Sequence, residues 1–111
     1  MFARVVTFAG GDPTRVDEVI AAVRDRVNSG APALADSKSF WMLVDRQKAA
    51  MLGISLFEDR ETLRRGSKAL EGLPHPAPDA GGQIVSIDVY EIPVVYERPE
   101  PAARPEPAKA S

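Results

Sequence analysis

The chain has 111 residues, a formal net charge of −2, 44% hydrophobic residues and no cysteine. This length suits one domain with a modest core, and the lack of cysteine excludes disulfides, thiolate metal ligands and cysteine nucleophiles. No lysine or arginine block of the kind that neutralises phosphates occurs, and no segment approaches the roughly 20 apolar residues of a membrane span. We therefore expect a cytoplasmic protein that binds neither nucleic acid nor membrane.

The first predicted elements are a strand and a helix. Residues 2–9, FARVVTFA, are rich in β-branched and aromatic side chains and stop at two glycines, which is typical of a strand. Asp12 and Pro13 predict a helix start, because aspartate caps free N–H groups and proline suits the first turn. The helix ends near Asn28, and its apolar stripe is formed by Val16, Ile20, Val23 and Val27.

A hairpin follows, with strands at Phe40–Val44 and Met51–Phe57 joined by a polar turn at residues 45–48. The length of the turn decides where Trp41, the single tryptophan, points. A two- or four-residue loop pairs it with Leu52 or Ile54, which we expect on the helix side, and a three-residue loop places it on the opposite face. We favour a packing role for Trp41 over a role as a ligand platform.

The second half predicts one more helix and one more strand. Asp59 caps a helix that runs to Gly72, and Gly66 in its middle costs about 1 kcal/mol relative to alanine, which indicates either a close backbone contact or a marginal helix. A Pro/Gly-rich loop leads into a last strand over residues 83–96, with Pro93 at an edge or bulge. The folded domain is therefore predicted over residues 1–96, followed by a disordered Pro/Ala/Glu-rich tail over residues 97–111.

The order strand, helix, strand, strand, helix, strand predicts an α+β, ferredoxin-like fold, with a four-stranded antiparallel sheet and both helices on one face. Side chains alternate between the faces of each strand, so one aliphatic set is expected against the helices. That set is Leu52, Ile54, Leu56, Val85, Ile87 and Val89. The open face is then expected to carry a mixed set, namely Arg4, Val6, Phe8, Met51, Gly53, Ser55, Phe57, Ser86, Asp88 and Tyr90. Its composition is that of a pocket wall or a wet subunit interface.

These residues resemble the dimeric α/β-barrel superfamily, and in particular the antibiotic biosynthesis monooxygenase domain. The resemblance is carried by FARVVTF, by LVDR and LGISLFED, and by VSIDVYEIPVV, in matching order over residues 1–96. It implies a homodimer in which two sheets pair face to face into a barrel, often with the last strand reaching across. Some members are cofactor-free oxygenases that act on polycyclic aromatics, and others degrade haem. The Asn, Trp and His that such members use cannot be matched by motif to Asn28, Trp41 and His75.

Three weak catalytic candidates remain, and each has a structural alternative. His75 is the natural general base because its ordinary pKa lies near neutrality, but in its proline-rich loop we favour an exposed, inert side chain. Asp88 beside Arg4 would make an anion site with a base, although a cross-strand ion pair is the favoured alternative. Tyr90 would donate to a substrate oxygen or to a neighbouring side chain. The expected ligand-binding residues are Arg4, Phe8, Met51, Ser55, Phe57, Ser86 and Tyr90.

Two functional hypotheses of different classes follow. The first is a small-molecule pocket for an apolar or aromatic ligand, with cofactor-free monooxygenase-like activity. The second is a non-catalytic dimeric module whose open face is only an interface. Haem binding is a weaker third, and no metal site or cofactor is predicted because a single histidine lacks ligand spacing.

Overall fold

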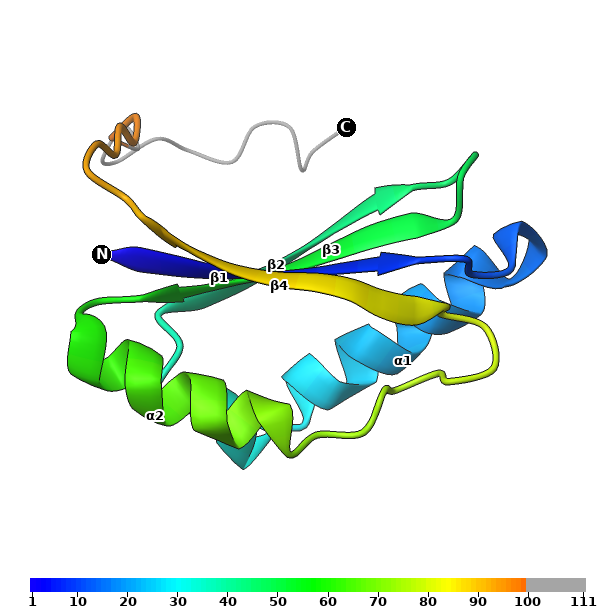
Figure 1. Cartoon of the computed structure of the whole chain (residues 1–111), viewed down its shortest axis with the longest axis horizontal. Coiled ribbons are helices and arrows are strands. Elements are labelled where there is room, and N and C mark those ends of the chain that lie inside the picture. The colour runs from blue at the N-terminus through cyan, green and yellow to red at the C-terminus, as the bar shows by residue number, and fades with distance from the viewer. Residues whose placement is uncertain (100–111) are drawn as a thin grey trace, which may run out of the picture.

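The structure, a computed structural model, describes residues 1–99. Its strands are β1 (Phe2–Ala9), β2 (Ser39–Asp45), β3 (Ala50–Phe57) and β4 (Gln83–Glu91), and its helices are α1 (Val16–Asn28) and α2 (Arg60–Glu71). The strands form one antiparallel sheet in the order β2-β3-β1-β4, and both helices lie on the same side of it (Figure 1). The predicted ferredoxin-like α+β fold is confirmed.

Local sequence signals fix both helix starts. The Asp12 carboxylate accepts a hydrogen bond from the Thr14 N–H at 2.9 Å, where a short 3-10 turn (η1, Pro13–Arg15) leads into α1. The Asp59 carboxylate accepts one from the Thr62 N–H at 2.8 Å, and the Thr62 hydroxyl in turn bonds the Asp59 backbone. Such reciprocal caps satisfy N–H groups that a helix start leaves free, as the sequence predicted.

The hairpin turn has the four-residue length that the sequence left open as one alternative. Asp45 pairs with Ala50, and its carboxylate accepts hydrogen bonds from the N–H groups of Gln47 and Lys48 at 3.1 and 3.2 Å. This register places Trp41 opposite Ile54, which is one of the two expected pairings.

The last strand is shorter than predicted. β4 ends at Glu91, and the N–H of Ile92 still donates to the Met1 carbonyl at 2.8 Å, after which Pro93 offers no N–H to extend the ladder. Residues 92–99 leave the body on the side of the sheet away from the helices (Figure 1). The predicted tail, residues 97–111, lies outside the described part from residue 100 onward, so its disorder stays a prediction.

The helices cover the face of β1 and β3 that the sequence assigned to the open side. Met51 is buried against Val16 and Val19 of α1, and the β1–β3 register places Phe8 opposite Met51 and Arg4 opposite Ser55. Arg4, Val6 and Phe8 therefore face the helices together with Met51, Gly53, Ser55 and Phe57. The prediction for these two strands was wrong. Ile87 and Val89 do share the helix side, because they pair with Val6 and Arg4, but they are 48% and 52% exposed and Val85 is 61% exposed, so β4 is not packed against the helices as expected.

Phe57 explains the glycine in the middle of α2. Its ring is fully buried and lies directly against the backbone of Gly66, where an added Cβ atom would collide with the ring edge. The close backbone contact predicted from Gly66 is confirmed, and it seats α2 on the end of β3.

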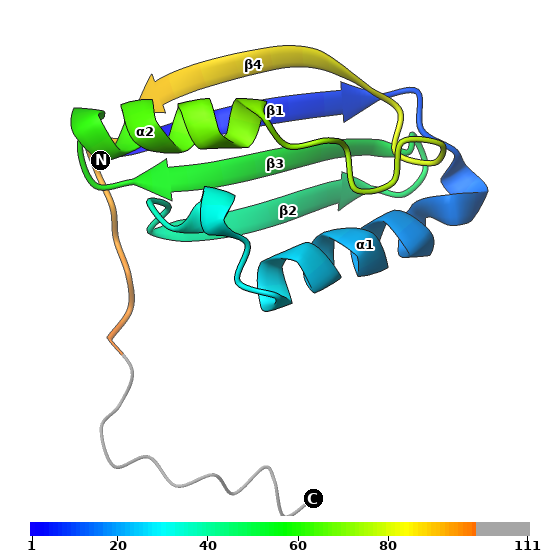
Figure 2. The same ribbon diagram turned by 90° about the horizontal axis from the view of Figure 1, so that it is seen from below.

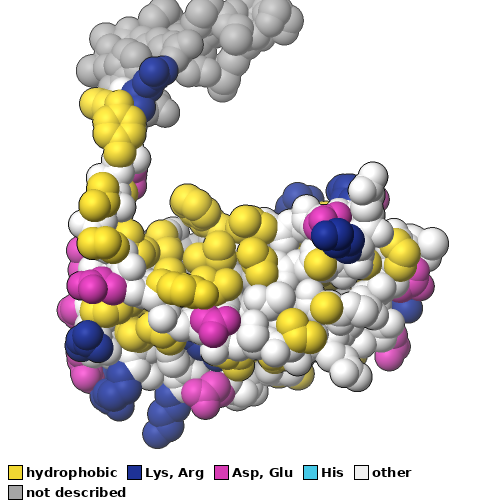
Figure 3. All heavy atoms as spheres, turned by 45° about the horizontal axis from the view of Figure 1, so that its top comes forward, with side chains coloured by type: hydrophobic (Ala, Val, Ile, Leu, Met, Phe, Trp, Pro, Cys, Tyr) yellow, Lys and Arg dark blue, Asp and Glu magenta, His cyan; other side chains and the backbone are white. Residues whose placement is uncertain are grey.

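The opposite face of the sheet carries the aliphatic set of β3. We call it the open sheet face, and its large apolar residues are Val5, Trp41, Leu43, Leu52, Ile54, Leu56 and Tyr90. Figure 3 shows hydrophobic side chains gathered on this side of the molecule. Trp41 is 58% exposed and Tyr90 is 57% exposed. The prediction that Trp41 packs on the helix side was therefore wrong, although Ile54 was one of its two expected partners.

Candidate functional site

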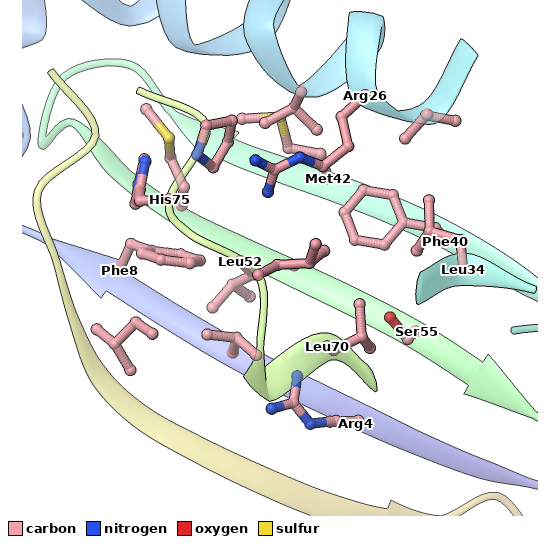
Figure 4. A pocket seen from close by; sticks show the side chains of 18 of the residues that line it. Arg4, Phe8, Arg26, Leu34, Phe40, Met42, Leu52, Ser55, Leu70 and His75 are labelled. Carbon is pink, nitrogen blue, oxygen red and sulfur yellow. The ribbon is translucent and has the colours of Figure 1, made fainter. Parts of the chain in front are cut away.

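A cavity of about 270 Å³ lies between the sheet and the helices (Figure 4). Its walls are mostly apolar and include Val6, Phe8, Val23, Phe40, Met42, Met51 and Leu70. The polar residues that line it are Arg4, Arg26, Ser55, Glu71 and His75. An apolar hollow with a few convergent polar groups is the usual form of a small-molecule site.

The sequence of β3 leaves this space unfilled. Gly53 and Ser55 are the small residues on the helix side of the strand, between the bulkier Met51 and Phe57. A Cβ atom at Gly53 would make only ordinary contact with the ring of Phe40, at 3.6 Å. Figure 2 shows that α1 and α2 cover different parts of the sheet and that the loop of residues 72–82 runs across the interval. Small side chains below a divided helix layer produce the hollow.

Arg4 and Ser55 form a polar pair at one end of the cavity. They are directly opposite each other on β1 and β3, and are only 7% and 4% exposed. Within residues 1–99 the Arg4 guanidinium makes no hydrogen bond, and no carboxylate lies within 4 Å of its nitrogens. These nitrogens are not fully enclosed by protein atoms, and Arg4 lines the cavity. Burial lowers the pKa of Arg4, and the charge of Glu71 acts in the opposite direction. The pair offers unused donors to the cavity.

His75 lies at the other end of the cavity, with its ring edge against Phe8 at a centroid distance of 5.1 Å. Its Nδ1 accepts a hydrogen bond from the Ala77 N–H at 2.8 Å. The Gly81 backbone packs against Nε2, where an added Cβ atom would collide. His75 is therefore part-buried rather than exposed as predicted, and its Nδ1 is already bonded to a backbone N–H.

The buried, hydrogen-bonded imidazole predicts a pH-dependent stability. Burial is the main cause that lowers the pKa of His75 below 6.5, and the charge of Arg26 acts in the same direction. Because the pKa of His75 is lower in the folded state than in the unfolded state, its full contribution to the free energy of unfolding is present above the unfolded pKa. That contribution is lost as the pH falls through the unfolded pKa towards the folded one. We expect the urea midpoint to decrease between about pH 7.5 and about pH 5.5, and His75→Asn to remove most of this decrease. An equal decrease in the variant would assign it to other groups.

The structure brings together four of the seven expected ligand-binding residues. Arg4, Phe8, Met51 and Ser55 line the cavity. Phe57 lies under α2 instead, and the β1–β4 register places Ser86, Asp88 and Tyr90 on the open sheet face. Asp88 pairs with Val5, so it cannot share a site or an ion pair with Arg4 on the other face.

Several cavity residues were missed by sequence reasoning. Phe40 and Met42 alternate with Trp41 on β2, so correct face assignment would have found them. Arg26 at the end of α1 donates to the Pro74 carbonyl at 2.8 Å and holds the loop over the cavity. Leu70 and Glu71 reach it from the last turn of α2. These long-range contacts have no local signal in the sequence.

Residues 1–99 lack two kinds of feature, a candidate membrane span and a metal-binding cluster. No helix in residues 1–99 combines the length and apolar character needed to cross a membrane. Within the same residues, no three or more His, Asp or Glu side chains are grouped so that they could hold a metal ion.

Comparison with known proteins identifies the fold. No protein-family model matches the chain, and no curated protein sequence matches it either. Among solved structures, a conserved protein from Methanosarcina mazei Go1 has a TM-score of 0.56 at 13% identity, covering 81% of this chain and 91% of that one. An antibiotic biosynthesis monooxygenase has a TM-score of 0.52 at 15% identity, covering 86% and 100%. A protein from Chloroflexus aurantiacus J-10-fl, provisionally named as such a monooxygenase, has a TM-score of 0.52 at 13% identity, covering 87% and 96%. The chain has the fold of these monooxygenase structures.

Proposed function

We propose that this protein binds a small apolar or aromatic molecule in the cavity between its sheet and helices. The observation that carries the proposal is the hollow itself, because Gly53 and Ser55 leave space between two aromatic side chains, Phe8 and Phe40, at the centre of a small domain. Protein interiors are otherwise packed to the density of organic crystals, and an unfilled apolar space is available to a ligand.

The test is a substitution that places a larger side chain inside the cavity. Gly53→Leu places a side chain in the cavity with room at its first atom, so the fold is expected to persist. Binding of naphthalene-based probes, measured by isothermal titration and by the rise in melting temperature, is expected for the natural protein and lost in Gly53→Leu. The matched control is Gly72→Ala, a glycine at the end of α2 whose added Cβ atom also meets only ordinary contact. Equal binding by Gly53→Leu would contradict the proposal.

Monooxygenase-like activity without a cofactor is the second candidate. It is favoured by the resemblance to antibiotic biosynthesis monooxygenases and by an apolar cavity suited to an aromatic substrate. In such a reaction the substrate supplies the electrons, so that one O₂ oxidises a ring C–H to a quinone C=O and leaves one water. The test is the conversion of 1,5-dihydroxynaphthalene to its hydroxynaphthoquinone, measured as oxygen uptake and as a change in absorbance. A rate that does not exceed the protein-free rate would leave binding as the function.

We further propose that a second copy of this chain covers the open sheet face. This face is apolar in the isolated chain, and an exposed apolar patch of this kind marks an interaction site. Residues 92–99 leave the body on the same side, with Val94 and Tyr96 among its most exposed apolar side chains. The ligand site and the subunit interface would then use opposite faces of one sheet.

A further inference from the structure

We propose that the ligand of this cavity is an aromatic acid, whose carboxylate binds Arg4 and Ser55 while its rings lie toward Phe8. The inference rests on the proposed function, because it assigns the chemistry of that same cavity. The observation that carries it is a buried guanidinium that opens into the cavity without a partner among residues 1–99.

A buried charge without a partner is costly to the folded protein. Arg4 lies on the central strand β1, next to Ser55 and facing the helices, so its charge loses part of its contact with water. The nearby C-terminal end of α2 and the carboxylate of Glu71 offset part of this cost, since both favour a cation. Glu71 is exposed and more than 4 Å from any Arg4 nitrogen, so the compensation is incomplete.

A ligand carboxylate would supply the anionic partner that Arg4 lacks within residues 1–99. The planar guanidinium presents paired N–H donors that match the two oxygens of a carboxylate, and the Ser55 hydroxyl adds a third donor on the same face. Such charge-assisted bonds are strongest where water is excluded. The charge balance of the cavity also favours an anion, because two arginines and one glutamate line it.

The length of the cavity sets the size of the acid. Arg4 and Phe8 are four residues apart on β1, which separates their Cα atoms by about 13 Å. Figure 4 shows Arg4 and Ser55 at one end of the cavity and Phe8 with His75 at the other. A molecule of two fused rings with one carboxylate spans this distance, so that its rings contact Phe8, Met42 and Met51 while the acid reaches Arg4.

The experiment compares 2-naphthoate with its neutral amide, which has the same shape, by isothermal titration. We expect the natural protein to bind the acid at least tenfold more tightly than the amide, and Arg4→Met to bind both equally. Lys68→Met, which removes an exposed positive charge from the outer face of α2, is expected to keep the preference. Glu71→Gln is expected to tighten acid binding several-fold without changing amide binding, because it removes the negative charge nearest Arg4.

Each alternative outcome has a distinct meaning. Equal binding of acid and amide by the natural protein, with Arg4→Met unchanged, would overturn this inference and leave the small-molecule cavity intact. If the natural protein binds neither 2-naphthoate nor its amide, both this inference and the proposed small-molecule site are overturned. Arg4→Met is expected to melt several degrees higher than the natural protein, since it removes a buried charge. A fall of more than about 5 °C would instead assign Arg4 a structural role and overturn the inference.

Discussion

Phe57→Ala is expected to lower the free energy of unfolding by about 3–5 kcal/mol. The Phe57 ring is fully buried between β3 and the middle of α2, so its removal leaves a cavity that the helix cannot fill without moving. The matched control is Leu56→Ala, the preceding residue on the same strand, whose side chain points to the open sheet face. Urea denaturation at low protein concentration is expected to show a much smaller loss for Leu56→Ala. Equal losses would contradict the face assignment.

The contact can also be tested from the helix. Alanine in place of a helical glycine ordinarily stabilises by about 1 kcal/mol, whereas overpacking a core costs about 1–3 kcal/mol. Gly66→Ala is therefore expected to destabilise the natural protein, because its new methyl group meets the Phe57 ring. In a Phe57→Leu background the same substitution is expected to stabilise, a reversal that a double-mutant cycle detects.

Trp41→Glu is expected to weaken self-association by at least about 100-fold, which corresponds to about 2.7 kcal/mol. Trp41 is already 58% exposed in the single chain, so the substitution leaves the protomer fold unaffected. In the proposed dimer each subunit would bury a tryptophan on the open sheet face, and tryptophan is the residue type whose loss costs interfaces most. The glutamate would also be buried there without a partner.

Sedimentation velocity measures the effect over a dilution series. The control is Ala21→Glu, which adds the same charge on the exposed side of α1. A natural protein that is monomeric at about 100 µM would contradict the dimer itself, since that concentration populates any dimer with a dissociation constant in the low micromolar range. A Trp41→Glu variant that stays dimeric would place the interface elsewhere on the surface.

Local signals in the sequence predicted the elements well, and they failed where a long-range choice was required. The caps at Asp12 and Asp59 and the hairpin turn are properties of a few neighbouring residues, whereas Gly66 meets the ring of Phe57 on another element, β3. Which face of β3 meets the helices depends instead on how much space the helices leave between themselves and the sheet. Burial preference assigned the wholly aliphatic Leu52, Ile54 and Leu56 to the helix side, and the structure places them on the open sheet face.

Arg4 shows why the site escaped sequence reasoning. A charged residue was expected to avoid the apolar layer, and that rule is sound for a filled core. Here the layer contains a cavity, and the arginine faces it. The residue types of the site were recognised in Arg4, Phe8, Met51 and Ser55, but the enclosing residues of α1, α2 and the loop came only from tertiary structure.

The alternation along β3 has a practical consequence for protein engineering. Met51, Gly53, Ser55 and Phe57 form one set and Leu52, Ile54 and Leu56 form the other, and Leu52 of the second set also borders the cavity. If the two proposals hold, a combinatorial library at Met51, Gly53 and Ser55 would alter which molecules the protein accepts, and one at Ile54 and Leu56 would alter how its copies assemble. Selections on the two libraries could be run independently and their winners combined in a single strand.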